Sequence, residues 1–257
     1  MLIGELKRAL EQDELVVHYQ TIVSAADGEV CGLEALVRWQ HPTRGLISPA
    51  DFIAFAEQTG LMEELTETVL RKTLPDLAAW HRAGSDAVLA VNVSGRDLGD
   101  RRFPARLAAL LEETGVDPAW LELEIAEDTI LSDPTRSHAI LERLRETGVR
   151  LAVDDFGAGR TSLQYLRKLN VDALKIDRSF THKLDDDPAC QAIVRSTIEL
   201  AHRLGLSVVA EGVETLETLD LLTSYGCDLL QGHLFSRPAP IGEVDLHTGV
   251  TTLIERP

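Results

Sequence analysis

The sequence has 257 residues, 44% of them hydrophobic, a composition that is ordinary for a globular protein and excludes a disordered chain. It carries 25 Lys and Arg against 42 Asp and Glu, which gives a formal net charge of -17. Most of such a surface repels a long nucleic acid, whereas a small anionic substrate would need a metal ion or a few well-placed cations.

Apolar runs alternate with helical patterns along the chain. The first two strands are expected at 15–23 and 32–39, joined by a short link with Asp27 and Gly28 at its centre, which is a hairpin signal. The later strands are short and rich in Val, Leu and Ile, as expected of parallel strands buried on both faces. They are expected at 87–93, 121–126, 150–155, 173–177, 207–211 and 229–231.

Helices are expected between these strands, because several amphipathic stretches begin near Pro and end at Gly. They cover 49–58, 61–82, 104–113, 134–147, 188–204 and 216–224. Repeated strand–helix units with about eight strands predict an α/β fold, a (β/α)8 TIM-like barrel with one antiparallel strand near the N-terminus. A doubly wound open sheet is the alternative. We expect one domain over 1–257, with a core of about 10–240 and a tail at 241–257 that forms a last helix or a loose end.

Polar residues recur where the predicted strands end, and Glu34 lies inside the second strand. In a barrel these ends meet on one face, where catalysis takes place. A single Asp after a strand is more often a helix cap. Five carboxylates, two amides and a lysine on successive strand ends instead predict a common site. The residues at these ends are Asn92, Glu124, Asp154, Asp155, Lys175, Asp177, Glu211 and Gln231.

Carboxylates crowded into one site repel each other, and a cation resolves this repulsion. All the expected ligands are oxygen donors, which favours Mg²⁺ or Mn²⁺. The adjacent Asp154 and Asp155 suit two ions, and two ions suit hydrolysis of a phosphodiester. Lys175 would then hold the attacking water or the phosphate charge. Glu211 would either accept a proton or complete the second metal site, and the sequence leaves both roles open.

The ordered set of motifs resembles the EAL domain family, from about Leu10 to Pro238. The signature Glu34-Ala35-Leu36 is continued by Arg38 and Trp39. The further motifs are Asn92-Val93-Ser94, Leu123 to Glu127, Asp154 to Gly159, Lys175-Ile176-Asp177, Ala210 to Glu214 and Gln231-Gly232.

The resemblance implies a bacterial signalling enzyme that hydrolyses cyclic di-GMP to linear 5'-pGpG with two Mg²⁺ or Mn²⁺ ions. It implies that Lys175 positions the catalytic water, and that Asp155 and Glu211 take part in catalysis. The implied ligands of the first ion are Glu34, Asn92, Glu124 and Asp154, and those around the second are Asp154, Asp155 and Glu211. We expect Ca²⁺ to inhibit, because its larger and looser coordination fits a two-metal geometry poorly.

The resemblance also implies contacts beyond the metal site. Glu127 resembles the glutamate that anchors the loop after Asp155, a loop that lies at the homodimer interface in the family. The implied substrate contacts are Gln20, Leu36, Arg38 and Gln231. The chain departs from the family pattern at Thr21, Ala126 and Arg160. These positions belong to the loop after Asp155 or to the rim of the site, and none of them is an implied metal ligand.

Two other functions remain as alternatives. Some EAL domains have lost catalysis and serve as receptors, but they usually lack a ligand that this chain retains. An unrelated barrel phosphodiesterase for glycerol-linked phosphates would not explain the ordered motifs.

The sequence predicts a cytoplasmic chain without a membrane span. It has three cysteines, Cys31, Cys190 and Cys227, and it lacks a signal peptide and a long apolar run. No sensor or regulatory domain precedes the motifs, so we expect a stand-alone enzyme or an excised domain.

Overall fold

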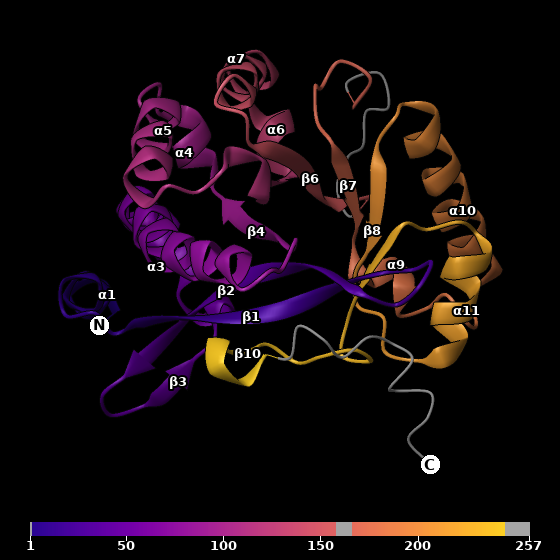
Figure 1. Cartoon of the computed structure of the whole chain (residues 1–257), viewed down its shortest axis with the longest axis horizontal. Coiled ribbons are helices and arrows are strands. Elements are labelled where there is room, and N and C mark those ends of the chain that lie inside the picture. Colours follow the sequence, from indigo (N-terminus) through magenta and orange to yellow (C-terminus); the bar gives the residue numbers. More distant parts are fainter. Residues whose placement is uncertain (1, 158–165, 245–257) are drawn as a thin grey trace.

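A closed eight-stranded sheet forms the centre of the computed structural model, which describes residues 2–157 and 166–244 (Figure 1). The strands follow the order β1-β9-β8-β7-β6-β5-β4-β2, and β2 pairs with β1 to close the barrel. This confirms the barrel and excludes the open sheet. The barrel strands are β1 (Leu15–Ser24), β2 (Val30–His41), β4 (Val88–Val93), β5 (Leu121–Ala126), β6 (Arg150–Phe156), β7 (Ala173–Ile176), β8 (Ser207–Ala210) and β9 (Leu229–Gln231).

The first strand runs against its neighbours, as the hairpin signal predicted. β1 is antiparallel to both β2 and β9, whereas the remaining barrel pairs are parallel. Two short antiparallel strands, β3 (Gly45–Ile47) and β10 (Ala239–Pro240), flank the β1–β2 ribbon outside the barrel. Neither was predicted, because two or three residues are too few to show an alternating pattern.

Helices surround the barrel, and each of the six predicted ones lies close to its expected place (Figure 1). The first of them is divided into a 3-10 turn, Pro49–Asp51, and α2 (Ile53–Thr59). The other predicted helices are α3 (Met62–Arg82), α5 (Phe103–Thr114), α7 (Pro134–Arg145), α10 (Pro188–Arg203) and α11 (Leu216–Ser224). The described part of the chain also contains helices that were not predicted: α1 (Leu2–Glu11), α4 (Gly95–Gly99), α6 (Glu127–Ser132) and α9 (Arg178–Thr181).

In the expected tail, a 3-10 turn covers Ile241–Glu243, and residues 245–257 lie outside the described part. Within residues 2–157 and 166–244, no helix combines the length and the apolar character needed to cross a bilayer.

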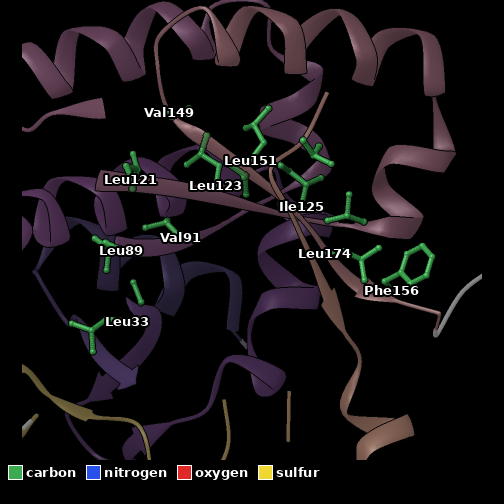
Figure 2. Close-up of a cluster of buried hydrophobic side chains, with 14 of the residues drawn as sticks. Leu33, Leu89, Val91, Leu121, Leu123, Ile125, Val149, Leu151, Phe156 and Leu174 are labelled. Atoms are coloured by element: carbon green, nitrogen blue, oxygen red, sulfur yellow. The ribbon is translucent and has the colours of Figure 1, made fainter. Parts of the chain in front are cut away.

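The side chains of each barrel strand alternate between an apolar layer under the helices and a polar barrel axis. Leu121, Leu123 and Ile125 of β5 are fully buried in the layer between the sheet and the helices (Figure 2). Because successive side chains of a strand point to opposite faces, Glu122 and Glu124 face the barrel axis. The same period of two brings polar residues from the other strands to this axis.

Candidate active site

Lys175 lies at the centre of the polar axis and is completely buried. Its Nζ is 2.6 Å from Glu124 Oε1 and 2.7 Å from Glu211 Oε1. The same Nζ is 3.6 Å from Glu34 Oε2 and 3.8 Å from Asp154 Oδ1. Four carboxylates from β2, β5, β6 and the end of β8 therefore surround one ammonium group, as the strand-end pattern predicted.

The charges of this cluster perturb one another strongly. Burial alone would lower the pKa of Lys175, but the surrounding carboxylates outweigh it and raise this pKa well above its usual range. Burial raises the pKa of Glu124 well above its usual range, and the neighbouring Glu34 and Asp154 add to this effect. Burial, Asp154 and Glu34 together raise the pKa of Glu211 to about 7, although Lys175 opposes them. The cluster therefore holds more negative charge than Lys175 alone can balance.

Two side-chain amides fix the orientation of Glu34. Asn92 Nδ2 donates to Glu34 Oε1 at 2.7 Å, and Gln231 Nε2 donates to Glu34 Oε2 at 2.6 Å. Gln231 Nε2 also lies 3.3 Å from Gln20 Oε1. Burial would raise the pKa of Glu34, but Lys175 and the two amide donors outweigh it and lower this pKa. Glu34 is therefore held as an ionised carboxylate.

A bulge in β6 turns two consecutive carboxylates toward the same site. Val153 pairs with Leu174 and Phe156 with Ile176, so β6 carries one extra residue between these pairs. Asp155 adopts the left-handed region with φ 54°, which is uncommon for a residue other than glycine. In a regular strand, Asp154 and Asp155 would point to opposite faces.

The resulting carboxylates fit a metal ion. Asp154, Asp155 and Glu211 each offer an oxygen, and these atoms lie within 4.8 Å of one another. Glu124 Oε2 is buried and has no hydrogen-bond partner among the described residues. Burial and then Asp154 raise the pKa of Asp155 to about 6, as expected where like charges meet. An oxygen-only donor set of this kind suits a hard divalent cation such as Mg²⁺ or Mn²⁺.

Glu127 anchors the backbone that follows these aspartates. It begins α6, and its Oε2 accepts a hydrogen bond from Gly157 N at 3.0 Å. The contact fixes the chain two residues after Asp155, where the resemblance implied an anchored loop. Gly159 and Arg160 of that loop lie outside the described residues.

Replacing Glu127 by Gln should lower kcat about 10-fold, because a neutral amide accepts a weaker hydrogen bond from Gly157 N than the carboxylate does, and the backbone after Asp155 is then held less firmly. Steady-state kinetics together with thermal unfolding would measure this effect. Asp128→Asn, in the same helix but exposed, is the matched control and should keep wild-type turnover. Equal kcat values for the two variants would contradict the anchoring role.

A cavity of about 270 Å³ opens above the carboxylates. Gln20, Leu36 and Gln231 are among the residues that line it. Arg38 is not among its lining residues, and Arg38 Nη1 donates to the carbonyl oxygen of Val37 at 2.9 Å. The contacts around Lys175 and this cavity therefore bring together the expected metal ligands and the expected substrate contacts other than Arg38, which lies farther along the β1–β2 ribbon.

Several residues of this cavity were not assigned to the site from the sequence. Arg178 and His182, on α9 and at its end, line the wall together with Glu214 and His233. Glu214 belongs to a recognised motif, but the other three follow their strands in segments without a periodic pattern. The backbone at Gly232 also matters, because a Cβ there would lie only 2.1 Å from the carbonyl oxygen of Val213. Only glycine lets β9 approach the loop after β8 so closely.

The barrel and the oxygen-donor cluster at the carboxyl ends of its strands place the chain in the class of TIM-like barrels with a candidate divalent-metal site. The family model described as EAL domain matches residues 3–238. The chain therefore belongs to the EAL domain family, and the resemblance seen in its motifs is confirmed.

The matches to named relatives cover nearly all of this chain. "Cyclic di-GMP phosphodiesterase NbdA" of Pseudomonas aeruginosa is 45% identical over 242 residues, which are 94% of this chain and 31% of that protein. "Cyclic di-GMP phosphodiesterase PdeR" of Escherichia coli is 37% identical over 91% of this chain and 35% of that protein. The chain thus spans about a third of the length of these curated relatives.

A solved structure agrees with the barrel over almost its whole length. The structure described as "PaMucR Phosphodiesterase, c-di-GMP complex" has a TM-score of 0.90 and 41% sequence identity. The match covers 93% of this chain and 97% of that one.

Proposed function

We propose that this chain hydrolyses cyclic di-GMP to linear 5'-pGpG in a metal-dependent reaction. The observation that carries the proposal is the ring of four carboxylates around the buried Lys175, beneath a cavity at the carboxyl ends of the strands. The names of NbdA and PdeR, and the cyclic di-GMP complex of PaMucR, support the same substrate.

The residues at the site fit two divalent ions. In this proposal Glu34, Asn92, Glu124 and Asp154 hold the first ion, and Asp154, Asp155 and Glu211 hold the second. When bound, Mg²⁺ or Mn²⁺ ions supply a more acidic water and neutralise charge on the phosphate oxygens. The support is the oxygen-only donor set and the surplus of negative charge in the cluster.

The side chains of the protein then orient the reactants and move the proton. Lys175 donates hydrogen bonds that align the attacking water, and its charge balances part of the negative charge of the surrounding carboxylates. Glu211, whose pKa is raised to about 7, can both hold a metal and accept a proton near neutral pH. Gln20, Leu36 and Gln231 line the cavity where the nucleotide lies.

The wider setting follows from the substrate. A second messenger acts inside the cell, so we propose that the domain works in the cytoplasm, which agrees with the free thiols of its three cysteines. We also propose a homodimer, in which the backbone anchored by Glu127 lies near the partner. Analytical ultracentrifugation at several protein concentrations would test this assembly.

The decisive experiment incubates the purified chain with cyclic di-GMP and either Mg²⁺ or Mn²⁺, and separates the products by chromatography. We expect linear 5'-pGpG, no conversion after a chelator, and inhibition by Ca²⁺. Tight binding of cyclic di-GMP without any conversion would indicate a receptor. Conversion of glycerol-linked phosphodiesters alone would indicate the unrelated barrel enzyme.

Metal affinity should rise with pH, because the ion must displace a proton from Glu211. The ordinary pKa of this carboxyl is 4.5 and its pKa in the folded protein is about 7, so between these values only the folded state keeps the proton. The unfolding free energy of the metal-free protein should therefore fall as pH rises through this window.

Calorimetric titration of Mg²⁺ or Mn²⁺ in buffers of different ionisation enthalpy measures the released protons. We expect more protons to be released per site at about pH 6, where Glu211 and Asp155 are still partly protonated, than at about pH 8.5, where both are ionised. Metal binding without proton release at the lower pH would contradict the raised pKa of Glu211.

A further inference from the structure

The cavity above the carboxylates is lined by two groups of residues that differ in charge. Glu34, Asp154 and Glu211 form the acidic wall, which the proposed function assigns to metal ions. The other wall contains Arg178, His182 and His233. Neither the metal chemistry nor the motifs of the family signature gives this second wall a role.

Close packing holds Arg178 next to the loop that carries Glu211. Gly212 adopts φ +68°, and a Cβ at this position would lie only 2.6 Å from Arg178 Cβ. The hydroxyl of Thr181, in the same helix, donates a hydrogen bond to the carbonyl oxygen of Glu211. The helix α9 is therefore fixed against the catalytic loop, with Arg178 at the edge of the cavity.

The carboxylate of this second wall faces its imidazoles and not Arg178. Glu214 lies between two imidazoles, with His233 Nδ1 3.6 Å from Oε1 and His182 Nδ1 4.0 Å from Oε2. Asp177, the acidic neighbour of Arg178 in the chain, accepts a hydrogen bond from Ser179 N at 3.0 Å. Arg178 itself forms no ion pair with any carboxylate in the described part of the chain. Its guanidinium is therefore available to a ligand.

We propose that Arg178 binds the phosphodiester of the cyclic dinucleotide that is not cut, an inference that rests on the proposed function. A cyclic dinucleotide carries two phosphates on opposite sides of one ring, each with a negative charge. The acidic residues, which the proposed function assigns to metal ions, would take the scissile phosphate, and the other phosphate would then lie at Arg178, the arginine that lines the same cavity. The forked donors of a guanidinium match phosphate oxygens, which makes Arg178 the specificity-determining residue for a substrate with two phosphates.

Arg178→Gln tests this role, because it removes the charge and keeps most of the side-chain length. We expect kcat/KM for cyclic di-GMP to fall about 10- to 100-fold. Turnover of bis(p-nitrophenyl) phosphate, which has one phosphate and needs only the acidic wall, should not change. Arg178→Lys should recover part of the loss. Arg203→Gln is the matched control, because Arg203 is also exposed but lies at the last turn of α10, away from the cavity.

Two results would overturn the inference in distinguishable ways. If the wild-type chain cuts cyclic di-GMP and Arg178→Gln behaves like Arg203→Gln, the assignment of Arg178 is wrong and the proposed function stands. If the wild-type chain cuts bis(p-nitrophenyl) phosphate but neither binds nor cuts cyclic di-GMP, the proposed substrate and the role of Arg178 are wrong together.

Discussion

Replacing Lys175 by methionine is expected to abolish hydrolysis of cyclic di-GMP and to destabilise the metal-free protein. Lys175 Nζ contacts Glu124 and Glu211 within 2.7 Å, and all three side chains lie on the barrel axis. Removing one partner of a buried ion pair typically costs about 3–5 kcal/mol, because the remaining charge stays buried without compensation. The loss should be smaller at low pH, where protonation removes the charge of the two glutamates.

Urea denaturation of wild type and Lys175→Met, with a chelator present and at two pH values, measures the stability effect. Added Mg²⁺ or Mn²⁺ should restore part of the stability of the variant, since the ion also balances the carboxylates, but should not restore turnover. Lys168→Met, which removes an exposed lysine of the described chain, is the control and should match wild type in both properties. Full activity of Lys175→Met would disprove the role of Lys175 at the site.

A comparable loss of turnover, about 10³-fold or more, is expected for Glu34→Gln. The substitution keeps the shape of the side chain but removes a negative charge from the proposed first metal site. Glu34 accepts hydrogen bonds from the NH₂ groups of Asn92 and Gln231. In the variant, the new NH₂ group would face one of these donors, and no hydrogen bond could form there unless that amide turns around. The fold should persist, because an amide can rotate and present its oxygen instead.

Kinetics and thermal unfolding, each at several Mn²⁺ concentrations, separate the two effects of Glu34→Gln. We expect weaker metal dependence of the melting temperature and almost no turnover at any concentration. The matched control is Glu112→Gln, at an exposed position of α5, which should leave both unchanged. A variant that reaches the wild-type rate at high Mn²⁺ would show that Glu34 assists metal binding but not the chemical step.

Much of the barrel could be predicted from the sequence, because its signals are local. The apolar runs of the strands, the Pro and Gly residues at the helix ends and the hairpin at Asp27 and Gly28 each depend on a few neighbouring residues. The site could be predicted for a related reason. Once strands and helices alternate, the topology alone brings Glu124, Lys175 and Glu211 to one end of the barrel.

Features that depend on contacts between distant segments could not be predicted in this way. Gln231 donates to Glu34 across 197 positions of the chain, and no local pattern specifies the strand register that allows this contact. The bulge that turns Asp155 toward Asp154 is likewise visible only in the pairing of β6 with β7. The helix of Arg178 has four residues, too few for a helical period, so this wall of the cavity had no signal.

The hydrogen bonds among Gln20, Gln231 and Glu34 cross the seam where the barrel closes, since β1 pairs there with β9 as well as with β2. The first and last barrel strands must therefore dock before Glu34 reaches its working orientation. This docking joins segments about 200 positions apart, as the Gln231–Glu34 separation of 197 shows, and such non-local steps come late in folding. Recovery of activity during refolding would consequently report the final closure of the sheet, and fragments cut from either end should be inert even where their remaining strands keep their structure.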